Sequence, residues 1–193
     1  MQSTILHSES FKTNNWSGGT TTQLFIYPHS ADYLHKNFLF RLSTASVNIE
    51  KSEFTSLPGV SRQLMVLEGE TILTHKNHHS KKLGKFDIDE FEGNWKTSSI
   101  GRCTDFNLMT KDEVSGELSA ITIETHRSSK YQINNKYSWL FIYAFLGKTN
   151  IKLDNYTTLL DQGSLLVLNH PDITNIEIEG IEKSELIFVK IAI

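Results

Sequence analysis

The chain has 193 residues, of which 38% are apolar and 21% are charged, and its formal net charge at pH 7 is −3. This size and composition are ordinary for a protein that buries a hydrophobic core, and they exclude a disordered or fibrous chain. The charge is low and no block of like charges occurs, so we expect neither nucleic acid nor an anionic membrane as a partner.

The cysteine content and the N-terminal sequence predict a cytoplasmic protein. Cys103 is the single cysteine, so one chain can form neither an internal disulfide nor a zinc site of several thiolates. The N-terminus has no basic start followed by an apolar run of signal-peptide length. No stretch approaches the roughly 18 apolar residues that a membrane-spanning helix needs.

Segments rich in Ile, Val, Thr, Phe and Tyr recur along the chain with polar turns between them, whereas alanine is scarce. This composition favours strands over helices. A polar loop with one Trp and a Gly pair, residues 14–20, precedes the first long strand. Many short strands at close spacing predict antiparallel sandwiches or barrels. In chain order the predicted strands are residues 21–27, 38–47, 62–68, 71–75, 104–109, 118–125, 139–146, 150–153, 164–168, 175–178 and 185–193.

An approximate internal repeat indicates a duplicated unit. Gly69 and Gly147 each follow an apolar strand and precede another, and a second glycine step comes at a similar distance, at Gly84 and Gly163. The two offsets are almost equal, which favours duplication of one strand–turn–strand unit. We therefore expect Gly69 to match Gly147 and Gly84 to match Gly163, with each unit forming one jelly-roll half.

The histidines and acidic residues do not predict a metal site. No His-x-His pair occurs among the eight histidines, although small β-barrels often hold a metal on such a pair. We interpret His75, His78 and His79 as part of a solvated hairpin tip, because successive strand residues point apart and no carboxylate partner is evident. The acidic residues that follow are interpreted as a solvated connection: Asp87, Asp89, Glu90 and Glu92. We predict no specific metal and no cofactor.

Nucleophilic catalysis finds no support in the sequence. Cys103 lies beside the cation Arg102 but has no patterned His partner, so we favour a structural thiol. No Gly-x-Ser-x-Gly elbow, phosphate-binding loop or dinucleotide fingerprint occurs.

Polar residues on otherwise apolar strand faces are the remaining signal. Strand alternation places Arg41 and Ser43 on one face with aliphatic residues, and places Asp105 and Asn107 together on another strand. Arg62 begins a mostly apolar strand. If these side chains point inward, they must pair with one another or with a ligand. A structural ion pair of the Arg41–Asp105 kind, a solvated outward face and a ligand pocket all stay open.

Five short motifs follow one another along the chain: WSGGTTTQ at residues 16–23, FRLSTA at 40–45, FTSLPGVSR at 54–62, FEG at 91–93 and DFNLM at 105–109. Together and in this order they resemble the HutD/Ves family. The resemblance extends from about residue 14 to residue 120, and the last third of the chain is similar only in its rhythm of strands. The chain departs from the family where Phe40 replaces the Trp before Arg41, and from its histidine-utilisation branch where Thr110 and Lys111 replace paired arginines.

The resemblance implies an all-β bicupin, with two tandem cupin-like (jelly-roll) barrels. We place the first barrel, with the N-terminal loop, at residues 1–110 and the second at residues 117–193, and an N-terminal strand that crosses over stays open. In the family, the first loop and the Arg-bearing strands would face one cleft. Some members are linked to histidine utilisation, with urocanate or formylglutamate as a proposed ligand, and others to stress responses.

We favour a protein that binds or senses a small anionic metabolite, with a regulatory role in amino-acid catabolism or stress. Arg41 and Arg62 would clamp a carboxylate, and Trp16 would form an apolar wall. The alternatives are a metal-independent, isomerase-like cupin enzyme that uses Asp105 as its general acid or base, and an interaction module. A homodimer is compatible with each. The predicted ligand-binding residues are Trp16, Gly18, Gly19, Thr20, Arg41, Ser43, Arg62, Asp105 and Asn107.

Overall fold

A computed structural model describes residues 2–134, 136–154, 156–171 and 175–193. The described residues form nineteen strands and one short 3-10 helix, η1 (Ser8–Ser10), without any α-helix. The all-β prediction is confirmed. Within these ranges no helix has the length and apolar character needed to cross a membrane.

The chain divides into an N-terminal unit, Phe11–Val114, and a C-terminal unit that combines Met1–Ser10 with Ser115–Ile193. Strand β1 (Gln2–Leu6) belongs to the C-terminal unit because it pairs antiparallel with β17 (Leu165–Asn169). The sequence left such an N-terminal crossover open, and β1 is the strand that makes it.

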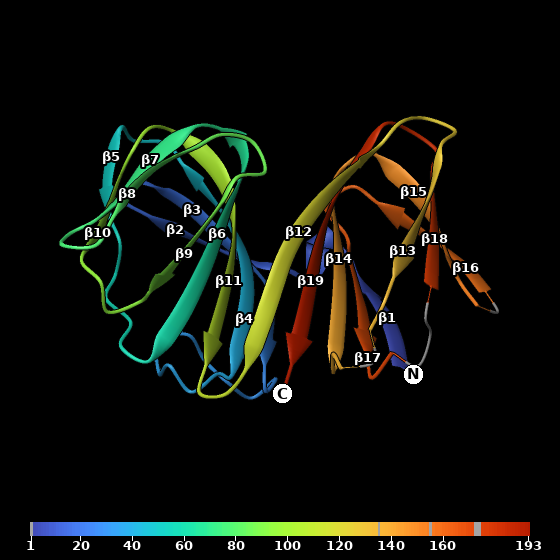
Figure 1. Ribbon diagram of the computed structural model, residues 1–193, viewed down its shortest axis with the longest axis horizontal. Helices are drawn as coiled ribbons and strands as arrows, with labels where there is room; N and C mark the ends of the chain where they lie inside the picture. The colour runs from blue at the N-terminus through green and yellow to red at the C-terminus, as the bar shows by residue number, and fades with distance from the viewer. Residues whose placement is uncertain (1, 135, 155, 172–174) are drawn as a thin grey trace. The chain divides into compact units, whose positions relative to one another are not determined.

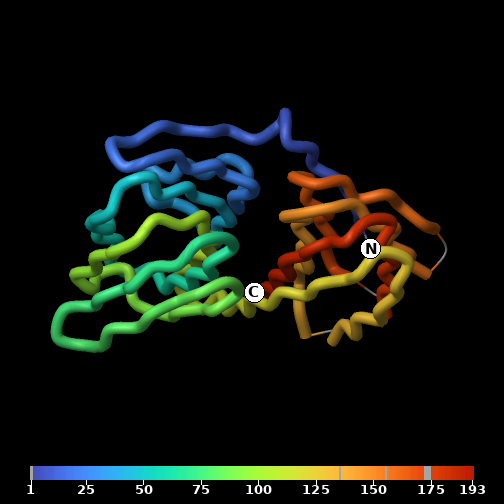
Figure 2. Tube along the Cα trace, turned by 90° about the horizontal axis from the view of Figure 1, so that it is seen from above, coloured from blue at the N-terminus to red at the C-terminus, as the bar shows by residue number. Residues whose placement is uncertain are grey.

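Two antiparallel sheets form the N-terminal unit (Figure 1). The six-stranded sheet has the order β2-β3-β4-β11-β6-β9, and the four-stranded sheet has the order β5-β10-β7-β8. The hairpin of β2 and β3 forms the dark-blue edge of this unit in Figure 2. The strands are β2 (Lys12–Trp16), β3 (Gly19–Tyr27), β4 (Phe40–Val47), β5 (Lys51–Glu53), β6 (Val60–Gly69), β7 (Thr71–His75), β8 (Ser80–Leu83), β9 (Ile88–Glu92), β10 (Thr97–Ile100) and β11 (Cys103–Lys111).

The C-terminal unit also has two antiparallel sheets, with the orders β1-β17-β14-β19-β12 and β13-β18-β15-β16. Its remaining strands are β12 (Ser115–Ile123), β13 (Ser128–Gln132), β14 (Trp139–Leu146), β15 (Lys148–Leu153), β16 (Tyr156–Asp161), β18 (Asn175–Gly180) and β19 (Ser184–Ala192). The row β17-β14-β19-β12 repeats the order β9-β6-β11-β4 of the other unit, and the four-stranded sheets correspond strand by strand.

The predicted jelly-roll fold is confirmed, but the sheets do not close into barrels. Across the part of the chain that the structure describes, no strand pairing joins a larger sheet to the four-stranded sheet of the same unit. Each unit is therefore a sandwich of two open sheets whose inner faces form the core.

Gly69 and Gly147 occupy matching turns, as predicted. Gly69 lies between β6 and β7 with φ +78°, and Gly147 lies between β14 and β15 with φ +79°. A side chain at either position would approach backbone oxygen closely: a Cβ on Gly69 would lie 2.5 Å from the carbonyl oxygen of Arg102. Both glycines are thus required by backbone conformation and by the close approach of the neighbouring chain.

The predicted match of Gly84 with Gly163 is wrong by two residues. The N–H of Gly163 donates to the carbonyl of Ala144 at 2.7 Å, and the N–H of Phe86 makes the same bond to Val66 at 2.7 Å. Phe86 has φ +66° and Gly163 has φ +79°, so these two residues hold the equivalent turn position. The sequence pointed to Gly84 because glycine is the residue that usually adopts a positive φ, whereas a positive φ is rare for Phe.

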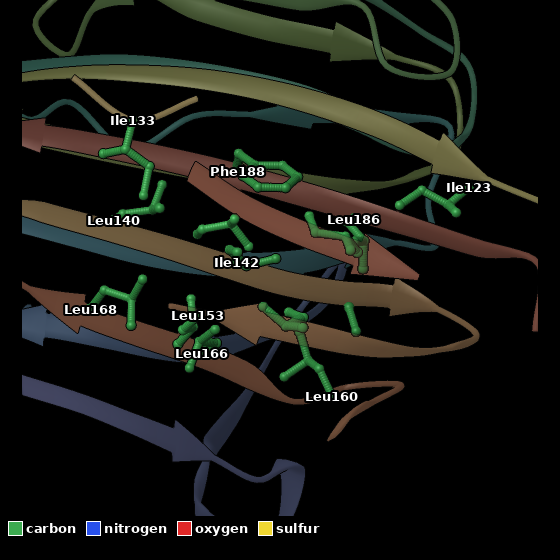
Figure 3. Packing of buried hydrophobic residues seen from close by; sticks show 14 residues of the cluster. Ile123, Ile133, Leu140, Ile142, Leu153, Leu160, Leu166, Leu168, Leu186 and Phe188 are labelled. Atoms are coloured by element: carbon green, nitrogen blue, oxygen red, sulfur yellow. The ribbon is translucent and has the colours of Figure 1, made fainter. Parts of the chain in front are cut away.

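The interiors of the two units differ in chemistry. In the C-terminal unit fourteen buried apolar residues form a cluster, and Figure 3 shows labelled members such as Leu140, Leu186 and Phe188 packed together. In the N-terminal unit a smaller cluster surrounds Leu64, Val66 and Phe91, and another surrounds Ile26, Phe38 and Met109. This unit also buries several polar side chains, which form the site described next.

Candidate functional site

Five buried polar residues lie on one face of the six-stranded sheet: Arg41, Ser43, Arg62, Asp105 and Asn107. On the central strand β11, Met109 is paired with Arg41 of β4 on one side and with Arg62 of β6 on the other. Asn107, two residues away, is paired with Ser43. Since alternate strand residues share a face, this register brings the five side chains together.

The guanidinium of Arg41 is held by two hydrogen bonds and one aromatic ring. Its Nε donates to Oε1 of Gln23 at 2.9 Å, and its Nη1 donates to Oγ of Ser43 at 3.0 Å. The ring of Tyr33 lies 4.5 Å from its guanidinium carbon. Burial lowers the pKa of Arg41, because desolvation disfavours the charged form.

Arg62 is enclosed between aromatic rings and makes one side-chain hydrogen bond. Its Nη2 donates to Oδ1 of Asn107 at 3.0 Å. The rings of Phe54 and Phe91 lie 4.9 and 5.0 Å from its guanidinium carbon. Its buried Nε has no hydrogen-bond partner among the described residues. Burial lowers the pKa of Arg62 to about 10. The residue thus keeps a donor that the protein itself does not use.

Asp105 does not neutralise these cations through an ion pair. Its Oδ1 accepts a hydrogen bond from Nδ2 of Asn107. Burial raises the pKa of Asp105 to about 7, while the nearby Arg62 acts in the opposite direction. In the described ranges, no carboxylate lies within ion-pair distance of Arg41 or Arg62. The Arg41–Asp105 ion pair that the sequence allowed is therefore not what the structure shows.

The buried polar residues of β6 and β11 have apolar equivalents in the C-terminal unit, whereas Arg41 and Ser43 of β4 correspond to the polar Glu117 and Ser119 of β12. In the C-terminal unit, Leu140 is paired with Lys190 and Ile142 with Phe188. The pair Leu140–Lys190 is equivalent to the pair Arg62–Met109 of the N-terminal unit, and the pair Ile142–Phe188 is equivalent to Leu64–Asn107. The equivalents of Arg62, Asn107 and Asp105 are thus Leu140, Phe188 and Leu186, all members of the apolar cluster in Figure 3.

The N-terminal hairpin does not lie with the arginines. Gly19 is paired with Val47, at the opposite end of β4 from Arg41. Six residues of strand separate them, which corresponds to about 20 Å. The ring of Trp16 instead covers Gly18, where a Cβ would lie 2.1 Å from it.

Close packing accounts for the glycine pair of this hairpin. A Cβ on Gly19 would lie 1.8 Å from the carbonyl oxygen of Ser46. Thr20 is paired with Ser46, so it shares the face opposite to that of Arg41. The structure therefore gathers Arg41, Ser43, Arg62, Asp105 and Asn107, but not Trp16, Gly18, Gly19 and Thr20.

Four residues of the site were missed from the sequence: Gln23, Tyr33, Phe54 and Phe91. Gln23 was detectable as a polar residue in an otherwise apolar strand end, and Phe54 and Phe91 each begin one of the quoted motifs. Tyr33 lies in the connection between β3 and β4 and carries no comparable signal.

A separate hollow of about 190 Å³ lies on the other face of the same strands. It is lined by residues that alternate with those of the site, among them Ser61, Gln63 and Thr110. It is therefore distinct from the arginine face, although Arg62 and Phe91 also border it.

The histidines near the β7–β8 turn correct another expectation. His75 and Asp89 are buried, with 2% and 4% of their surface exposed, rather than solvated. The Nε2 atoms of His75 and His79 both lie within hydrogen-bond distance of the Asp89 carboxylate. Convergence and a carboxylate partner, judged absent from the sequence, are both present. Cys103 is buried as expected of a structural thiol, and burial raises its pKa to about 12.

Comparisons with known proteins agree with this fold. The conserved protein of unknown function PA5104 from Pseudomonas aeruginosa PAO1 has a TM-score of 0.85 and 20% identity, over 100% of both chains. HutD from Pseudomonas fluorescens SBW25 has a TM-score of 0.73 and 18% identity, over 97% of this chain and 98% of that chain. Oxalate decarboxylase from Lactobacillus farciminis, a cupin-fold protein, has a TM-score of 0.71 and 8% identity, over 97% of this chain and 85% of that chain.

At these identities the structural likeness establishes the fold alone. No curated protein matches the chain in a sequence search. The HutD family model, however, matches residues 8–188, which is nearly the whole chain. The chain therefore belongs to the HutD family.

Proposed function

We propose that the N-terminal unit binds a small anionic metabolite between Arg41 and Arg62, and that the protein acts as a binding or sensing protein of the HutD type. The supporting observation is a pair of buried guanidiniums without a carboxylate at ion-pair distance among the described residues. Uncompensated buried charge costs several kcal/mol. A bound carboxylate would offset that cost.

The geometry suits a small carboxylate. Arg41 and Arg62 flank the same residue, Met109, on the two strands beside β11, so their backbones are about 9–10 Å apart. Aromatic rings cover the guanidinium faces, which leaves the N–H edges for hydrogen bonds to an anion. The unused Nε of Arg62 is one such donor.

Two relatives suggest the first probe. The P. fluorescens HutD structure is described as a formate condition, and the L. farciminis oxalate decarboxylase structure is a formate complex. Formate is the smallest carboxylate, so it tests the charge requirement with the least steric demand. Larger carboxylates such as urocanate and formylglutamate then test the regulatory role in amino-acid catabolism that HutD membership suggests.

Calorimetry and thermal shift with formate, acetate, oxalate, urocanate and formylglutamate test the proposal, with acetamide as a neutral analogue. We expect carboxylates but not acetamide to stabilise the protein. Arg41→Met should weaken the best anion by about 2–5 kcal/mol, the range for truncating one partner of a desolvated charge pair. The exposed Arg102→Met is the matched control. Equal binding by Arg41→Met, or no response to any carboxylate at millimolar concentration, contradicts the proposal.

A second candidate is an enzyme acting on a small carboxylate. The observation that favours it is the pKa of Asp105, raised to about 7, where a carboxyl is best suited to proton transfer at neutral pH. Incubation of a carboxylate panel with the protein, followed by NMR of the products, decides the question. Turnover by the wild type that is lost in Asp105→Asn, with ligand binding retained, would establish catalysis.

A further inference from the structure

Three side chains at the β7–β8 turn form a compact cluster of metal-binding type. His75 is the last residue of β7, and His79 follows it across a tight turn in which the N–H of His75 donates to the carbonyl of His79 at 2.8 Å. Asp89 comes from β9, where burial alternates so that Asp89 and Phe91 both point inward. One hairpin and one strand therefore deliver two imidazoles and one carboxylate to the same point.

The distances suit a shared cation. Nε2 of His75 lies 3.1 Å from Oδ2 of Asp89, and Nε2 of His79 lies 3.0 Å from Oδ1 and 3.2 Å from Oδ2. The three ligand atoms all lie within 4.8 Å of one another. Ligand atoms around a tetrahedral zinc ion, with bonds of about 2.0–2.1 Å, are separated by about 3.3 Å. Small side-chain movements would close the cluster around an ion.

The hydrogen bonds around His75 are compatible with a cation in this place. Oγ1 of Thr97 lies 2.8 Å from Nδ1 of His75 and 3.3 Å from the carbonyl oxygen of Trp95, so the hydroxyl can donate to the carbonyl and accept from Nδ1. In that tautomer Nε2 of the neutral ring presents a lone pair toward the carboxylate of Asp89 at 3.1 Å, and both would be ligands of a metal ion placed between them. Donation by the other ring nitrogen is also how metal-bound histidines are usually oriented.

We infer that His75, His79 and Asp89 bind a divalent first-row transition-metal ion, with at least one coordination position left open. Two imidazoles and a carboxylate suit Zn²⁺ and its neighbours rather than Ca²⁺ or Mg²⁺, which prefer oxygen ligands. The side chain of His79 is 39% exposed, so the ion would have access from solvent. His78 lies beside the cluster but stacks on Trp95 at 3.8 Å between ring centroids, which leaves it outside the ligand set.

The ligands of this cluster are different residues from those of the arginine face, and the inference does not rest on the proposed anion. These three ligands come from the β7–β8 hairpin and from β9, and they were interpreted from the sequence as solvated residues. Among the described residues, these three are the histidine, cysteine or acidic side chains that bring three ligand atoms within 4.8 Å of one another.

Titration calorimetry with Zn²⁺, and with Ni²⁺ for comparison, tests the inference on protein without a histidine tag, stripped with a chelator and then freed of it. We expect one Zn²⁺ per chain and a higher melting temperature for the wild type. His79→Ala and Asp89→Asn should each weaken Zn²⁺ by more than about tenfold. Because His79 is partly exposed, its variant should fold, and the neighbouring His78→Ala is the matched control that should bind as the wild type does.

Quenching of Trp95 fluorescence by Ni²⁺ gives an independent readout, since the Trp95 ring lies 5.6 Å from that of His75 and 5.8 Å from that of His79. Quenching should disappear in His79→Ala and in Trp95→Phe. Wild-type protein that binds no Zn²⁺ at submillimolar concentration, or His79→Ala that binds it as tightly as the wild type, would overturn the inference. So would an Nε2–H proton on His75 detected by NMR in the zinc-saturated protein.

Discussion

Arg62 and Leu140 hold the same place in two repeats of one fold. Each lies seven residues before a glycine with φ near +80°, and each is paired with a residue of the neighbouring strand, Met109 of β11 or Lys190 of β19. An aliphatic side chain at this position is therefore compatible with the sandwich. The arginine is not required by the fold.

Arg62→Leu should accordingly fold and lose the anion. We expect the free energy of unfolding to change by less than about 2 kcal/mol, because loss of the hydrogen bond to Asn107 is offset by removal of a buried charge. Urea denaturation and calorimetry with formate measure the two effects. In the reverse change, Leu140→Arg should cost about 3–5 kcal/mol by placing a charge in the apolar cluster. An unfolded Arg62→Leu would show that the arginine is structural.

Asp105 should make stability fall as pH rises. Its pKa is raised to about 7 in the folded chain from 3.8 in the unfolded chain, so between these values the folded state holds a proton that the unfolded state has released. The free energy of unfolding from this group is therefore fully present below pH 4 and is lost as pH rises through 7, at up to about 1.4 kcal/mol per pH unit. Urea denaturation at pH 5 and pH 8 measures this effect. From pH 5 to pH 8 the free energy of unfolding should fall more for the wild type than for Asp105→Asn. Asp112→Asn, an exposed carboxyl, should track the wild type.

Anion affinity should rise as pH falls from 8 to 6. Protonation of Asp105 removes a negative charge close to Arg62, while formate stays ionised over this range. Calorimetry at several pH values should therefore show tighter formate binding at pH 6 and proton uptake on binding. In Asp105→Asn the affinity should be high and nearly independent of pH. A wild-type affinity for formate that does not change with pH would show that the charge of Asp105 does not influence anion binding.

Trp16→Ala should leave anion binding unchanged. The Trp16 ring covers Gly18 and lies near Ile49, about 20 Å along β4 from Arg41, so its loss affects the hairpin alone. We expect a loss of about 1–3 kcal/mol in the free energy of unfolding and formate affinity within about twofold of the wild type. Gly19→Ala should destabilise more, because its Cβ would meet the backbone of Ser46. Weaker formate binding by a folded Trp16→Ala variant would contradict this prediction and would show that the β2–β3 hairpin contributes to anion binding.

Cys103 should be unreactive in the folded protein. It is 8% exposed, and burial raises its pKa to about 12, so the thiolate needed for disulfide exchange is scarce at neutral pH. Reaction with Ellman's reagent should be slow for native protein and fast in denaturant, with one thiol per chain. A rapid native reaction would show that the β11 end opens locally.

The sequence predicted the strands and the site's charged residues better than it predicted the partners of those residues. Alternation grouped Arg41 with Ser43 on β4 and Asp105 with Asn107 on β11, and left open whether these faces point inward, because strand periodicity is local. The Trp16 hairpin was misplaced because motif order does not reveal which end of β4 it meets.

The cluster of His75, His79 and Asp89 was missed for a related reason. It depends on contact between the β7–β8 turn and β9, and the spacing of the three residues along the sequence does not predict that contact. The turn position of Phe86 was missed because a positive φ was expected at a glycine.

Phe91 stands between the two sites of the N-terminal unit. Its ring centroid lies 5.0 Å from the guanidinium carbon of Arg62 and 4.5 Å from the ring centroid of His75. One ring is thus shared by the proposed anion site and the proposed metal site, and an occupant that displaces it from one side would alter the packing on the other. The two affinities would then be linked, and linkage is reciprocal. Titrations with anions are therefore comparable between preparations only when the metal content of the protein is held constant.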